Sequence, residues 1–104
     1  MLGPMQILEA DGKGVVELSK IGSHATGVIS PVPNPAQGDR ADVNAGGKSI
    51  AQVPLNLSGE TRFPIPKSVL LDFADIGVTP FYYKAEDQFG NSEESEKKDF
   101  VIKQ

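Results

Sequence analysis

The sequence predicts an all-β domain, either a sandwich or a barrel, built from short strands. Two observations lead to this prediction. Eleven glycines and eight prolines are spread along the 104 residues, well above the usual combined share of about 12%. No window of fifteen residues is free of them, so a long helix has no place to form. The stretches between them alternate apolar and polar residues, which is the period of a strand.

The first two thirds of the chain contain four stretches with strand character, each bounded by glycine or proline. They are residues 15–21, 26–32, 39–45 and 49–57. Proline cannot donate a ladder hydrogen bond, so Pro54, Pro64 and Pro66 are expected on edge strands or at strand ends. Residues 66–71 are expected to form one helical turn that begins near Pro66.

The last third carries the clearest strand pattern. Phe81, Tyr83 and Ala85 share one face, and the residues between them share the other. A turn is expected over residues 87–91, a charged and solvated turn or edge over 92–99, and a closing strand around Phe100.

The length is that of one domain and leaves no room for two. The sequence therefore predicts a single domain over residues 15–104, preceded by a leader or linker over residues 1–14.

Composition excludes several classes of protein. The formal net charge is −4 and the ten basic residues are scattered, so nucleic acid is not an expected partner. No stretch approaches the roughly 20 apolar residues of a membrane helix, so no membrane insertion is expected. The absence of cysteine removes disulfides, thiol nucleophiles and thiolate metal sites. The first residues lack the pattern of a signal peptide, so any export signal is expected elsewhere in a longer chain.

No catalytic constellation stands out, and the sequence predicts no enzyme. The run Gly46-Gly47-Lys48-Ser49 resembles the end of a phosphate-binding loop, but Asp42 occupies the position of its first glycine. A glycine hairpin turn is the favoured interpretation. His24 is the single histidine. Asp72 and Asp75 are three residues apart, but their segment is typical of a loop, so they are interpreted as turn-forming residues and not as the carboxylate pair of a glycosidase.

One acidic turn is a candidate calcium site. Asp87, Asn91 and Glu93 could supply several of the six to eight oxygens that calcium takes. The spacing does not match the EF-hand loop. The favoured alternative is a tight turn in which Asp87 and Asn91 bond the backbone and Gly90 takes a positive φ. Apart from this calcium candidate, no cofactor is expected.

Residues 77–104 resemble the last two strands of bacterial immunoglobulin-like repeat domains. An aromatic alternating strand runs into an Asp, a short gap and Gly-Asn, and a charged turn and a final strand follow. The matching positions are Tyr83, Ala85, Asp87, Gly90, Asn91, Phe100 and Ile102. Residues 29–40 and 63–70 resemble earlier parts of the same pattern. The resemblance implies an immunoglobulin-like β-sandwich of about seven antiparallel strands.

The residues with the greatest expected importance are structural. Aromatic and apolar side chains are expected to fill the core between two sheets. They are Phe63, Ile65, Phe81, Tyr83 and Phe100, and Gly90 is expected to shape the turn.

The resemblance implies a non-catalytic structural or adhesion module, a spacer or presenter within a larger bacterial surface or secreted protein. Its expected partners are neighbouring domains of that chain and a host or surface protein or glycan. The alternative is a binding module for a glycan or protein receptor, either calcium-stabilised or part of a phage or effector particle. Residues 22–27 and 34–38 are the loops that such a binding module would present to its ligand. An exposed cluster drawn from Phe73, Phe89 and Tyr82 would indicate such a binding surface.

Overall fold

The computed structural model describes residues 2–32 and 38–104, and these residues form nine strands and two short helices. The first half contains β1 (Gln6–Ile7), β2 (Val15–Glu17), the 3-10 turn η1 (Leu18–Lys20), β3 (His24–Ile29), β4 (Arg40–Ala45) and β5 (Lys48–Pro54). The second half contains β6 (Thr61–Pro66), α1 (Lys67–Leu71), β7 (Val78–Glu86), β8 (Ser92–Glu94) and β9 (Lys98–Lys103).

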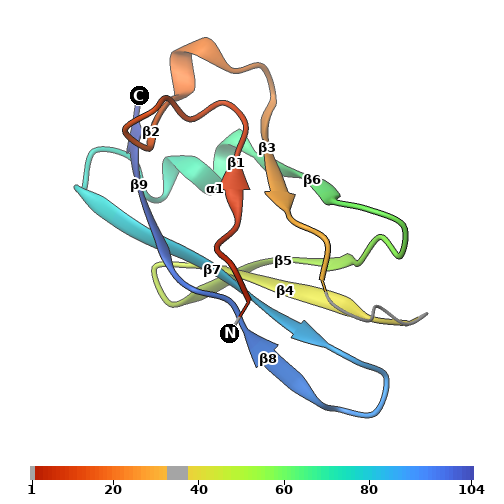
Figure 1. Ribbon diagram of the computed structural model, residues 1–104. Coiled ribbons are helices and arrows are strands. Elements are labelled where there is room, and N and C mark those ends of the chain that lie inside the picture. The colour runs from red at the N-terminus through yellow and green to blue at the C-terminus, as the bar shows by residue number, and fades with distance from the viewer. Residues whose placement is uncertain (1, 33–37) are drawn as a thin grey trace.

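The strands form two sheets that face each other across one core (Figure 1). The smaller sheet has the order β1-β3-β6, and the larger has the order β2-β9-β7-β4-β5 with β8 added to β7. All strand pairs are antiparallel except β2 with β9, which is parallel. The predicted all-β sandwich is therefore confirmed.

Alternation along β7 places every second side chain in the core. Phe81 and Tyr83 are buried, whereas Tyr82 between them is partly exposed. Phe81 packs edge to face against Phe100 with ring centroids 5.3 Å apart, a geometry that the aromatic quadrupoles favour. The smaller sheet contributes Phe63 and Ile65, both buried. All five side chains expected in the core lie there.

The run Gly46-Gly47-Lys48-Ser49 is a hairpin turn, as predicted. Ala45 and Lys48 are paired, and Gly46 and Gly47 between them have φ of 58° and 83°. Two successive positive φ angles define the type I′ turn that matches the twist of a hairpin. The prediction for the prolines is also confirmed, because β5 and β6 are both edge strands and need no donor on their open side.

Residues 2–14 take part in the fold instead of leading into it. β1 pairs with β3 in the smaller sheet, and Met5 and Ile7 are buried in the core. The strand expected over residues 15–21 ends at Glu17, where η1 begins. Nine strands are described where the resemblance implied about seven. Elements of two or three residues, such as β1 and β2, are too short to leave a periodic pattern in the sequence.

The charged stretch 92–99 contains the exposed edge strand β8 and the first two residues of β9, and one of its residues is buried. Ser95 lies in the interior, where its Oγ accepts a hydrogen bond of 2.9 Å from the backbone N–H of Tyr83. The N–H of Ser95 in turn donates to the carbonyl of Tyr83 at 2.8 Å. This serine extends the attachment of β8 to β7 by one residue beyond the regular ladder.

Candidate functional site

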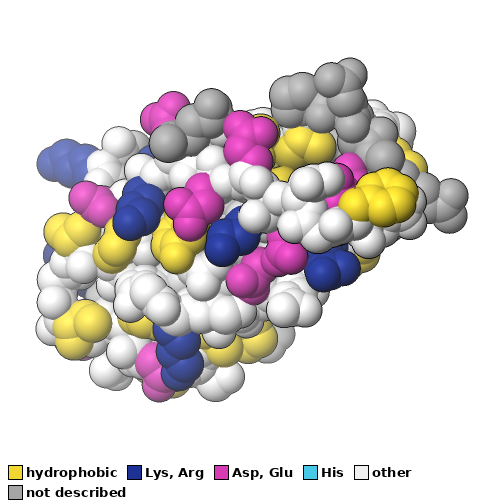
Figure 2. Space-filling view, turned by 90° about the horizontal axis from the view of Figure 1, so that it is seen from below, with side chains coloured by type: hydrophobic (Ala, Val, Ile, Leu, Met, Phe, Trp, Pro, Cys, Tyr) yellow, Lys and Arg dark blue, Asp and Glu magenta, His cyan; other side chains and the backbone are white. Residues whose placement is uncertain are grey.

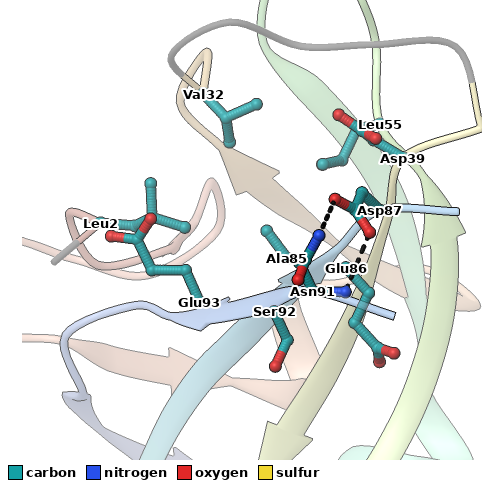
Figure 3. Close-up of a pocket in the computed structure, with 10 residues that line it drawn as sticks. All are labelled: Leu2, Val32, Asp39, Leu55, Ala85, Glu86, Asp87, Asn91, Ser92 and Glu93. Carbon is teal, nitrogen blue, oxygen red and sulfur yellow. Dashed lines mark hydrogen bonds between the residues drawn. The ribbon is translucent and has the colours of Figure 1, made fainter. Parts of the chain in front are cut away.

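The candidate site is a hollow at the end of the sandwich where β7 meets β8 (Figure 3). It has a volume of about 350 Å³. Its apolar lining comes from distant parts of the chain: Leu2, Val32, Leu55 and Ala85. Its polar lining is mostly acidic: Asp39, Glu86, Asp87, Asn91, Ser92 and Glu93. The sandwich therefore presents apolar surface and carboxylates together at this end.

Asp87 shapes the turn between β7 and β8. Its Oδ1 accepts hydrogen bonds of 2.9 Å from the backbone N–H groups of Phe89 and Asn91, and its Oδ2 accepts one of 3.0 Å from Asn91 Nδ2. The Asn91 side chain and then the backbone N–H groups hold the pKa of Asp87 below its usual value. Gly90 follows with φ of 89°, a conformation that glycine adopts without strain.

The three candidate calcium ligands occupy this hairpin but do not converge as a ligand shell. Asp87 and Asn91 are bonded to each other, while Glu93 extends from β8 on the side of Leu2 (Figure 3). In the described part of the chain, no group of three His, Cys, Asp or Glu side chains is placed to hold a metal ion. The geometry is that of the hydrogen-bonded turn.

Calcium is expected to leave the stability of this domain unchanged. A calcium ion at Asp87 would have to compete with the three hydrogen bonds that its two oxygens already accept. The melting temperature, measured by differential scanning calorimetry, should be the same in millimolar calcium chloride and in EDTA. A rise in the melting temperature with calcium alone, absent with magnesium, would restore the metal site.

The domain is expected to lose stability in alkali because Tyr83 is buried. Burial, and then the charge of Glu93, raise the pKa of the Tyr83 phenol above its usual value. An unfolded tyrosine ionises near pH 10, so folding gains stability from this group below that pH and loses it as the pH rises through the folded pKa. Urea unfolding from about pH 9 to 11 should show a steeper loss in wild type than in Tyr83→Phe. An equal loss of stability in wild type and in Tyr83→Phe would mean that another group is responsible for the pH dependence.

The other polar candidates lie apart from the hollow and from one another. His24 is exposed, and its Nδ1 lies 3.2 Å from Ser23 Oγ. Asp72 lies 3.9 Å from Lys48 on the surface. Asp75 has φ of 60° in the loop before β7, the conformation of a turn residue. The structure does not bring these groups together around a common point.

The expected aromatic loop cluster is not formed. Phe73 is buried and packs against Phe81 at 6.4 Å between ring centroids. Tyr82 is covered by the Lys97 ammonium, 5.3 Å from the ring centroid, which leaves Phe89 exposed at the hairpin tip. Of the candidate loops, residues 34–37 lie outside the described residues, and Gly27 is a buried strand residue inside β3.

The two sheets, their connections and the shared core define the class of fold as an immunoglobulin-like sandwich. No family model matches the sequence, and no curated protein matches it. Among solved structures, the chain is similar to a bacterial immunoglobulin-like domain from the ice-binding adhesin of M. primoryensis. The TM-score is 0.59, the match covers 97% of each chain, and 14% of the residues are identical. The shared property at this identity is the fold.

No helix in the described ranges 2–32 and 38–104 has the length and apolar character needed to span a membrane.

Proposed function

We propose that this domain is a non-catalytic structural and adhesion module. It would act as a spacer within a larger bacterial protein that is secreted or lies at the cell surface. The observation that carries the proposal is its sandwich fold, shared over 97% of its length with a domain of a bacterial adhesin. Neighbouring domains of the same chain are then its first partners.

The positions of the two ends of the chain support a role as a spacer. Leu2 lies beside Ser95 and lines the hollow with Ala85, near the end of β7. Lys103 ends β9 beyond Val78, at the start of β7. Seven residues of strand separate Val78 from Ala85, a distance of about 23 Å. Domains joined through these ends would follow one another along a line.

The geometry offers little to an enzyme. Asp87 is engaged in its turn, Asp72 faces Lys48, and His24 is an exposed surface group. A nucleophile or acid–base pair needs a second group within hydrogen-bond reach in a cleft. The hollow beside Asp87 contains carboxylates and apolar groups, which suits binding better than catalysis.

The test of the proposal is the size and location of the native polypeptide. Antibodies against the purified domain would be used on immunoblots of fractionated source cells. We expect a band far above 11.1 kDa in the surface or secreted fraction. A band of 11.1 kDa inside the cell would overturn the proposal that the domain is a module of a longer chain. A free-standing binding protein would then be the remaining hypothesis.

A tandem of three copies tests the spacer geometry separately. Each copy measures 39 Å along its longest axis and 23 Å across. In small-angle X-ray scattering, we expect the maximum dimension to grow by a similar amount with each added copy, as it does for domains in a line. A maximum dimension that stays nearly constant from two copies to three would show that the copies fold back on one another.

A further inference from the structure

A second hollow adjoins the first and lengthens it into a groove. It has a volume of about 480 Å³ and shares Asp39 and Leu55 with the first hollow. Its wall runs along the end of β5 through Val53 and Pro54 to Leu57, which is 48% exposed. We call the two hollows together the end groove. It passes from the edge of the larger sheet to the β7–β8 hairpin.

Most of the net charge of the protein surrounds this groove. Four carboxylates line the two hollows at this end of the sandwich, on Asp39, Glu86, Asp87 and Glu93. Arg40 is the one basic residue among the described lining residues, and its Nη2 lies 3.6 Å from Glu86 Oε2. This end therefore carries −3 of the formal net charge of −4. The remaining ten acidic and nine basic residues nearly cancel. Figure 2 shows how closely the two signs alternate on the side of the molecule seen from below.

An acidic rim around apolar walls selects one kind of occupant. Negative potential attracts cations and repels nucleic acids and acidic glycans. Neutral sugars stack on exposed aromatic rings, and the walls of the end groove are aliphatic. Lysine and arginine fit both features, because they carry a charge at the end of an apolar stem.

The groove is lined by residues along and just after the end of β5, from Gln52 to Leu57, and this course favours an extended chain. The end groove follows β5, the outer strand of the larger sheet. Pro54 has no N–H group, and the N–H of Leu55 already donates to the carbonyl of Asp39 at 3.0 Å. A bound segment would therefore gain its affinity from side chains in the hollows and not from a new β-ladder along this stretch.

We propose that the end groove binds an extended basic segment of a partner protein, with an apolar side chain against Leu55 and Leu57 and a lysine or arginine beside Glu86 and Glu93. This inference goes beyond the role as a module. It holds whether or not the domain belongs to a longer chain, so its failure leaves the proposed function untouched.

The direct test is the binding of a synthetic probe. A short fluorescein-labelled peptide of alternating arginine and leucine would be titrated with the domain and followed by fluorescence anisotropy. A peptide with glutamate in place of arginine is the control. We expect binding of the arginine peptide alone, weakened by added salt, because exposed charges are screened within about 8 Å at physiological ionic strength.

Two pairs of variants locate the site. The double variant Glu86→Gln/Glu93→Gln should weaken binding of the arginine peptide about tenfold. The control is the double variant Asp72→Asn/Asp75→Asn, which removes the same amount of charge at the other end of the domain and should leave binding unchanged. Leu57→Ser should weaken binding about fivefold, whereas Leu71→Ser, with a similar exposure in α1, should not. Melting temperatures near wild type show that each variant is folded.

Three results would overturn the proposal. The first is the absence of any binding of the arginine peptide at low salt. The second is an equal effect of the two charge pairs, which would mean attraction to the net charge alone. The third is unchanged binding by Leu57→Ser, which would place the peptide outside the groove.

Discussion

Tyr83→Ala is expected to lower the free energy of unfolding by about 3–5 kcal/mol, the usual cost of removing a large aromatic side chain from a core. Tyr83 is 2% exposed. It lies near the middle of β7, paired with Val43 of β4 on one side and hydrogen-bonded to Ser95, directly after β8, on the other. The cavity left by its ring would be held open by strands on both sides. Urea unfolding followed by circular dichroism measures the loss.

The adjacent tyrosine is the matched control. Tyr82 points to the outer face of the same strand and contacts Lys97, so Tyr82→Ala should cost about 1 kcal/mol or less. Equal losses for the two alanine variants, or a melting temperature for Tyr83→Ala close to that of wild type, would contradict the alternation described for β7.

β7 also shows which parts of the fold a sequence can predict. Its nine residues contain enough alternation to indicate both the strand and its buried face. β2 has three residues, and its partner β9 lies more than eighty positions away. Nothing local in residues 15–17 encodes that parallel pairing. The same limit applies to β1, whose buried Met5 and Ile7 are separated by a single residue.

The candidate site was less predictable than the core for the same reason. The turn at Asp87 could be predicted, because an Asp, a glycine and an Asn at this spacing bond one another locally. The end groove is assembled from the chain start, the β4 and β5 ends and the β7–β8 hairpin. Leu55 and Leu57 look like ordinary strand residues in the sequence. Leu55 lies in the same hollow as Glu86 because β4 pairs with both β5 and β7.

A close approach of Phe63 to the backbone distinguishes Gly27 from the other glycines. Gly27 is paired with Phe63 across β3 and β6, and the Phe63 ring lies over it. A Cβ atom at this position would stand 2.3 Å from Phe63 Cζ and 2.6 Å from Cε2. Real Cβ contacts are never this short, and the buried ring has little room to move because packed interiors contain few voids.

Gly27→Ala is therefore expected to destabilise the domain by about 2–3 kcal/mol, the upper part of the usual cost of overpacking a core. Gly22→Ala is the control, since nothing lies within 4 Å of the added atom and its φ is not in the left-handed region. That control should be neutral or slightly stabilising.

Adding Phe63→Leu to Gly27→Ala tests the mechanism by thermal unfolding. The smaller side chain should cost less in the Gly27→Ala background than in wild type, because it relieves the clash. Strictly additive losses would show that the alanine is accommodated without displacing the ring.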